Sequence, residues 1–185
     1  VPNPPLNPQS DCSKAVILCD KSQFVVDTLL GVGAMDEDVD NTCIGQEFSS
    51  AWYKWTCDVS GTLTFTLTPN NYQPGFESDD IDFVVYELPG GIDDCANKEA
   101  RRCMAAGANV GFPFQNWVRC NGPTGLRDGD PDSTEPAGCN GAGQNNFVDA
   151  LDMVAGHSYA LLVNNFSQSG LGFSLQWGGT GTFQG

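Results

Sequence analysis

Basic residues are scarce in this chain of 185 residues. It carries 8 Lys and Arg against 23 Asp and Glu, for a formal net charge of -15. Proteins that bind nucleic acid need a basic surface that displaces counterions from phosphates, and the few basic residues here are scattered along the chain. We therefore expect no nucleic-acid partner, and the same sign of charge disfavours an anionic membrane surface.

Long apolar runs are also missing. A membrane-spanning helix needs about 18 apolar residues in succession, and the longest candidate, residues 24–34, is shorter and contains Asp27. We expect no membrane insertion. Hydrophobic residues still make up 40% of the chain, which is too many for a disordered acidic tail. The length suits a single domain with a buried core.

Histidine occurs once, at His157. A Ser-His-Asp triad would have to use it, yet it lies in a Gly-His-Ser turn in front of an expected strand. A cysteine nucleophile is disfavoured if the cysteines are oxidised, and no motif supports a carboxylate pair for glycoside hydrolysis. We predict that the chain is not an enzyme and has no catalytic residue.

Cysteine, in contrast, is abundant for an acidic domain of this size. No two of the eight are spaced like a zinc knuckle, so we expect disulfides and an oxidising, extracellular compartment. Local pairing predicts bridges between Cys95 and Cys103 and between Cys120 and Cys139, although four cysteines allow three connectivities. The remaining four would pair among themselves and tie the N-terminal strands together: Cys12, Cys19, Cys43 and Cys57.

Strand patterns dominate the rest of the chain. Residues 62–68 alternate threonine with Leu and Phe, which is typical of a strand with one wet face. They should form a hairpin with residues 52–57 across the turn at 58–61. Further strands are expected at 15–18, 23–26, 81–88, 147–154, 158–164 and 172–177. Many short strands with Gly and Pro turns predict an all-β, disulfide-stapled β-sandwich of jelly-roll type.

Two segments fall outside this rhythm. Residues 1–10 are rich in proline, which favours an extended linker, or else an arm that docks on a neighbour. Residues 89–146 are rich in Gly and Pro and hold four of the eight cysteines. We expect a long stapled insertion loop there, with one short helix near 94–106. Residues 11–185 would then form one domain.

Several motifs resemble a known module. They are DCSKAVILC (11–19), SAWYKWTCDVSGTLTFTLTPNN (50–71), DDIDFVVYEL (79–88), CNGPTGL (120–126) and the segment 155–183. Together they resemble a repeat module of secreted multidomain surface proteins of Bacteroidetes, which are often PKD-associated and exported by type IX secretion or gliding-associated systems. The strand pattern is also similar to the jelly roll of bacterial pre-peptidase C-terminal domains. The resemblance implies a non-catalytic accessory or structural domain at the cell surface.

Acidic clusters are the main candidates for a binding site. Three carboxylates on a short loop can supply several of the oxygen ligands that Ca²⁺ prefers, and Ca²⁺ is the only cofactor we expect. The alternative is a solvated acidic surface with Asp side chains that cap turns. Asp82, and then Asp80, is the strongest candidate for a buried structural carboxylate. The candidate metal ligands are Asp36, Asp38, Asp40, Asp79, Asp80, Asp82, Asp128, Asp130 and Asp132.

Aromatic residues in the expected insertion suggest a second kind of site. Trp117, Phe112 and Phe114 could stack on sugar rings if they are exposed, or could form a small core under the loop. Thr28 and Ser133 lie in short patterns that resemble bacterial O-glycosylation sites.

The favoured function is a structural or adhesive module of a secreted surface protein or fibre. Its partners would be copies of itself or adjacent domains, and it could assemble through extended termini at 1–10 or 178–185. A polysaccharide-binding module is the alternative.

Overall fold

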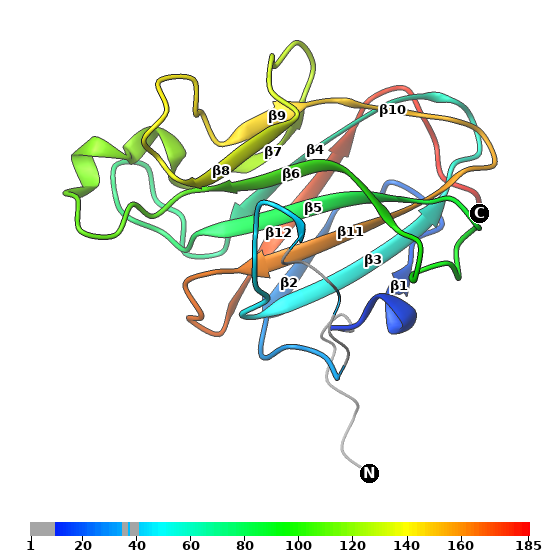
Figure 1. Ribbon diagram of the computed structural model, residues 1–185, viewed down its shortest axis with the longest axis horizontal. Coiled ribbons are helices and arrows are strands. Elements are labelled where there is room, and N and C mark those ends of the chain that lie inside the picture. The colour runs from blue at the N-terminus through cyan, green and yellow to red at the C-terminus, as the bar shows by residue number, and fades with distance from the viewer. Residues whose placement is uncertain (1–9, 35–36, 38–40) are drawn as a thin grey trace.

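The chain folds into two facing β-sheets (Figure 1). The computed structural model describes residues 10–34, 37 and 41–185. Sheet A has the order β1 (Val16–Ile17), β3 (Ser50–Thr56), β11 (Ser158–Asn165), β5 (Ile81–Leu88), β6 (Glu99–Ala106) and β8 (Thr134–Gly138). Sheet B has the order β2 (Phe24–Thr28), β12 (Leu171–Gly178), β4 (Gly61–Pro69), β7 (Thr124–Arg127) and β9 (Phe147–Asp149), and β10 (Leu151–Met153) also pairs with β4.

This architecture confirms the all-β, disulfide-stapled sandwich. Successive strands repeatedly cross from one sheet to the other, as the jelly-roll type requires. The only helices in the described part of the chain are short 3₁₀ turns, among them Cys12–Lys14, Phe114–Asn116 and Val118–Cys120.

Strand β4 alternates as its sequence predicts. Leu63, Phe65 and Leu67 are buried between the sheets, and the threonines between them are partly exposed. The hairpin expected between 52–57 and 62–68 does not form, because β3 belongs to sheet A and β4 to sheet B. The short turn after β3 carries the chain from sheet A to sheet B, so β3 and β4 do not pair with each other although they are close in sequence.

The region 89–146 differs most from expectation. It is not one long loop, since it supplies β6, β7 and β8 and so extends both sheets. The helix expected near 94–106 is strand β6, which pairs antiparallel with β5. Its sequence, EARRCMAA, has low intrinsic β propensity, and pairing with a buried neighbour overrides that preference.

Two hydrophobic clusters flank sheet A. The main core lies between the sheets and includes Trp55, Phe65, Phe83 and Phe173. An outer cluster lies on the opposite face of sheet A and is formed by Cys12, Trp52, Val84, Tyr86, Leu88, Cys103, Ala160 and Leu162. Ala15 and Ile44, from the segments 10–15 and 41–48, pack against it. We call these two segments the cover. They explain why every residue of β11 is buried.

Three disulfides hold the molecule together. Cys12 bonds to Cys95, Cys43 to Cys103, and Cys120 to Cys139, across sequence separations of 83, 60 and 19 residues. The first two bridges attach the cover to the region around β6. The Cys120–Cys139 bridge is the local pair that the sequence predicts.

The other predicted pairings are wrong. Cys95 and Cys103 do not bond, because an extended strand occupies 99–103 and spans about 13 Å over those four steps, too far for a bridge. Cys12 and Cys43 were expected to pair among the four N-terminal cysteines, but they bond to Cys95 and Cys103. Cys19 and Cys57 form no disulfide, since Cys57 faces the main core beside Phe183 while Cys19 is exposed.

The C-terminal segment docks on its own domain. Phe183 stacks on Trp55 at a ring-centroid distance of 4.9 Å and meets Trp177 edge-on at 5.2 Å. The Gln184 N–H donates to the Thr56 carbonyl oxygen at 2.9 Å. Residues 178–184 therefore complete the sandwich, rather than extend from it as a linking tail.

The bridges also indicate the compartment. Three intramolecular disulfides point to an oxidising environment, extracellular or periplasmic. In the part of the chain that the structure describes, no helix has the length and apolar character needed to cross a bilayer.

Candidate functional site

Asp82, which is buried, and Asp80, which is half-buried, form an acidic pair at the start of β5. Ile81 and Phe83 point into the main core, so strand alternation places both carboxyl groups on the opposite, covered face of sheet A, as the sequence predicts. Asp82 is 4% exposed, and its Oδ1 atom is buried without a hydrogen-bond partner. The two carboxyl groups are close enough to influence each other's protonation.

The surroundings of this pair favour its neutral forms. Burial raises the pKa of Asp80 to about 7, although the Ala108 N–H donates to its Oδ2 atom at 3.0 Å. Burial, together with the neighbouring Asp80, raises the pKa of Asp82 well above its usual range. Two neighbouring carboxyl groups in such surroundings either share a proton, which leaves one negative charge, or bind a cation between two ionised carboxylates.

Asp79 points elsewhere and serves the fold. Its Oδ1 atom accepts a hydrogen bond from Asn71 Nδ2 at 3.1 Å. Its Oδ2 atom accepts from Asn165 Nδ2 at 3.1 Å and from Ser169 Oγ. Both oxygens are thus already used to brace the β4–β5 connection and to join it to the end of β11 and the turn that follows, which suits a structural carboxylate better than a metal ligand.

The second acidic group, at 128–132, is organised around Asp130. Asp130 Oδ2 lies 3.0 Å from the Arg127 guanidinium and also accepts from Asn145 Nδ2, and Oδ1 accepts from the Asp132 N–H. Asp128 is exposed. These contacts are those of an Asp-stabilised turn, and the three carboxylates are not gathered around a common point.

The third predicted group, Asp36, Asp38 and Asp40, lies outside the described residues. Across the ranges that are described, no three His, Cys, Asp or Glu side chains come together in the manner of a metal centre. A cation at Asp80 and Asp82 would therefore complete its coordination with main-chain oxygens and water.

The aromatic group of the insertion is a small extension of the main core. Trp117 is 4% exposed and meets Phe114 edge-on at 4.9 Å. Phe112 is 55% exposed but has no described aromatic neighbour. Trp117 has no open ring face on which a sugar could stack, so the packing interpretation fits these residues.

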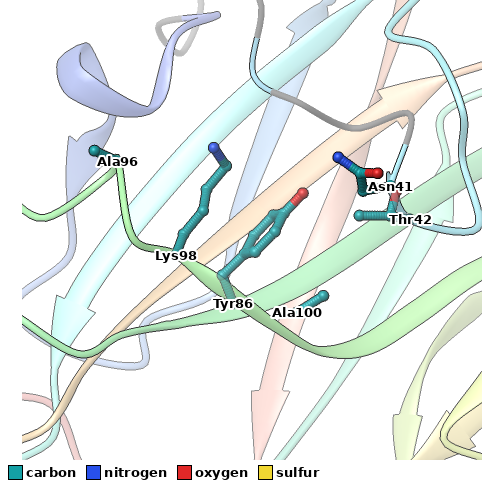
Figure 2. Close-up of a pocket in the computed structure, with 6 residues that line it drawn as sticks. All are labelled: Asn41, Thr42, Tyr86, Ala96, Lys98 and Ala100. Carbon is teal, nitrogen blue, oxygen red and sulfur yellow. The ribbon is translucent and has the colours of Figure 1, made fainter.

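A cavity of about 260 Å³ opens beside the cover, where sequence reasoning placed no site. Figure 2 shows Lys98 alongside the Tyr86 ring, with Asn41 and Thr42 across from them. The Lys98 Nζ atom lies 5.7 Å from the ring centroid, 3.7 Å from Glu37 Oε2 and 3.4 Å from the Cys95 carbonyl oxygen. The cavity thus combines an aromatic ring, an ammonium group and small polar side chains.

Two further buried acids, Glu135 in strand β8 and Glu37, were not predicted from the sequence. Glu135 is 1% exposed, and its two carboxylate oxygens accept from the N–H groups of Asn145 and Asn146 at 2.7 and 3.0 Å. Glu37 Oε1 accepts from the Cys12 N–H at 2.8 Å and so anchors the cover. These acids are recognised only by the backbone N–H groups that donate to them. Those groups come from other parts of the chain, so the sequence does not reveal the contacts.

His157 lies at the surface and pairs with an acid. Its Nδ1 atom is 2.7 Å from Glu87 Oε1, and half of its side chain is exposed. No Ser or Cys nucleophile is hydrogen-bonded to its ring among the described contacts. Thr28 and Ser133, the predicted modification sites, are both exposed.

Comparisons with protein-family models, with curated proteins and with solved structures found no match.

Proposed function

We propose that the chain is a non-catalytic extracellular module with a structural or adhesive role, one unit of a secreted surface protein or fibre. The observation that carries the proposal is the set of disulfides that fasten the cover across sheet A. Such cross-links keep a domain folded where no chaperone acts on it. They stabilise by limiting the unfolded state, and long loops gain most.

The charge of the molecule agrees with a role in the open environment. A net charge of -15 keeps a densely displayed domain soluble through mutual repulsion. The resemblance to repeat modules of secreted surface proteins supports the same role, with copies of the chain or adjacent domains as partners.

Of the two termini proposed for assembly, only the N-terminal segment is still a candidate. Residues 178–184 pack on their own domain, so they are poorly placed to join a neighbour. The proline-rich segment 1–10 remains as the candidate for contact with another copy or domain.

The test compares the full chain with a variant that lacks residues 1–9. Sedimentation velocity over a concentration series should show association of the full chain and loss of association in the shortened one. Beads coated with the full chain should likewise clump, and beads coated with the variant should stay dispersed. A full chain that stays monomeric and leaves beads dispersed would reject the assembly role.

Catalysis is tested separately. Incubation with peptide, ester and polysaccharide substrates should give no turnover. Turnover that disappears in Asp80→Asn or His157→Ala would contradict the non-catalytic assignment. Asp80 belongs to the acidic pair with Asp82, and His157 is the single histidine of the chain.

Polysaccharide binding is the second candidate, and the Tyr86 cavity favours it. The cavity would hold a sugar through the polar groups of Lys98, Asn41 and Thr42. The Tyr86 ring is 3% exposed and stacks on Trp52, so it would form the wall of the cavity and not a stacking platform. A glycan array should then show selective binding that Lys98→Ala weakens and Trp117→Phe preserves. Equal binding by both variants, or none by the native chain, would reject this role for the cavity.

A further inference from the structure

The space around Asp82 lacks a partner for one oxygen. Asn164 faces Asp82 across the β11–β5 pairing, but the hydrogen bonds of its amide group go to residues 46–49. Asn164 Oδ1 accepts from the N–H groups of Phe48 and Ser49 at 2.8 and 3.2 Å, and Nδ2 donates to the Gln46 carbonyl oxygen at 3.2 Å. Asn164 thus makes no hydrogen bond to Asp82, whose Oδ1 atom has no partner in the described part of the chain.

Asp80 is held in position by hydrogen bonds of its main chain and of its carboxylate. Its N–H donates to Ser167 Oγ at 2.8 Å, its carbonyl oxygen accepts from the Phe166 N–H at 2.9 Å, and its carboxylate accepts from the Ala108 N–H. A Cβ atom at Gly107 would lie 1.9 Å from Asp80 Oδ1. Only glycine there lets the carboxylate rest against the backbone.

A shared proton accounts for only part of this geometry. One proton can bridge Asp80 to Asp82, but it leaves the buried Oδ1 atom of Asp82 with no donor. An unsatisfied buried acceptor costs about 1–3 kcal/mol. A cation bound to both carboxylates would satisfy that oxygen and remove the repulsion at the same time.

The geometry points to a calcium site formed by the carboxylates of Asp80 and Asp82, which joins the start of β5 to the segment 107–108. The available ligands are oxygens, which suit a hard cation. Two carboxylates match a divalent charge. Mg²⁺ demands a near-ideal octahedron of ligands, whereas Ca²⁺ accepts an irregular set of oxygens, so two fixed carboxylates with main-chain and water oxygens favour Ca²⁺. This site does not depend on the adhesive role.

The experiment is thermal unfolding of the oxidised full chain after treatment with chelator. Ca²⁺ is added from about 0.01 to about 10 mM, a range that brackets extracellular calcium modules, and Mg²⁺ is added in a parallel series. The melting temperature of the native chain should rise by about 5–10 °C at a hundredfold excess over Kd. Isothermal titration should give one Ca²⁺ per chain, and Mg²⁺ should give a much smaller shift.

Two variants separate the site from general charge effects. Asp82→Asn keeps the shape of the side chain and should abolish the calcium-dependent shift without lowering the melting temperature in chelator. Asp128→Asn removes an exposed carboxylate and should keep the full shift. If Asp82→Asn does not fold, Gly107→Ala, which crowds Asp80, should weaken calcium binding at least tenfold.

Two results would overturn the site. One is an unchanged melting temperature and no titration heat with Ca²⁺ in the native chain, which would leave a shared proton as the only bridge. The other is a calcium shift that persists in Asp82→Asn and Gly107→Ala, which would place the ion elsewhere.

Discussion

Single side chains of the acidic clusters have different tasks, although the sequence presents them alike. Asp79 joins the β4–β5 connection to the end of β11, Asp130 holds a turn through Arg127, and Asp80 lies beside the buried Asp82. Strand alternation predicted that Asp80 and Asp82 share one side of β5. The donors that surround each carboxylate come from distant loops, so the sequence alone did not tell a satisfied acid from an unsatisfied one.

Asp79→Ala should destabilise the fold strongly. The change leaves the donors of Asn71, Asn165 and Ser169 without their acceptor, and hydrogen bonds to a buried charged group contribute about 1.5–3 kcal/mol. We expect a loss of about 3 kcal/mol in the free energy of unfolding, measured by urea titration. Asp128→Ala is the matched control and should change it by less than about 0.5 kcal/mol. Similar values for both would refute the role of Asp79.

The acid pair makes stability depend on pH in an unusual direction. The pKa of Asp80 is raised to about 7 in the folded chain, so folding binds the proton more tightly than the unfolded chain does. Its contribution is fully present below the unfolded pKa and is lost as the pH rises through about 7. In chelator, the melting temperature should therefore fall from mildly acidic to mildly alkaline pH.

The control for this effect is Asp82→Asn, in which the fall should be much smaller. A native chain whose melting temperature is constant or rises over that interval would contradict the pairing of Asp80 with the buried Asp82.

At the scale of strands and loops, the sequence was most informative where alternation is strict. It located β4, β5, β11 and β12 to within a few residues, since their apolar faces must all reach one core. It missed β6, whose charged and small residues become a strand only through pairing with β5. It also misassigned the partner of β3, because a short connection can either turn back or cross between sheets.

The contribution of each disulfide to the free energy of unfolding should increase with the length of the loop that it closes. For loops of 60 and 19 residues, the chain-entropy relation gives about 4 and about 3 kcal/mol. The paired variant Cys43→Ala/Cys103→Ala should thus lose more stability in urea than Cys120→Ala/Cys139→Ala. The reverse order, or no loss in either, would show that the cover is not held by its bridge.

Trp117 should matter for packing and not for binding. Its truncation to alanine removes a large buried side chain from the edge of the main core, and such changes cost about 3–5 kcal/mol. Thermal unfolding of Trp117→Ala should show this loss, with Phe112→Ala as the exposed aromatic control. A stable Trp117→Ala variant would mean that the ring is free to meet a ligand.

For the molecule as a whole, covalent cross-links and the cover turn an ordinary sandwich into one in which the central strands of sheet A, β3, β11 and β5, are buried on both faces. The cysteine content predicted the oxidising compartment, and the many short strand patterns predicted the sandwich. The pattern of bridges could not be predicted, because it depends on which segments the fold brings over sheet A. Cys12 and Cys43 reach their partners only once the cover lies across β3, β11 and β5.

Peptide mapping by mass spectrometry under non-reducing conditions is the sharpest test of the claim that disulfides fasten the cover over sheet A. The account predicts the linked pairs Cys12–Cys95, Cys43–Cys103 and Cys120–Cys139 in native protein. It also predicts that the exposed Cys19 is alkylated at once. Cys57 should react only after unfolding, because burial and the nearby Asp58 raise the pKa of its thiol. Free thiols throughout the native protein, or a Cys95–Cys103 bridge, would contradict it.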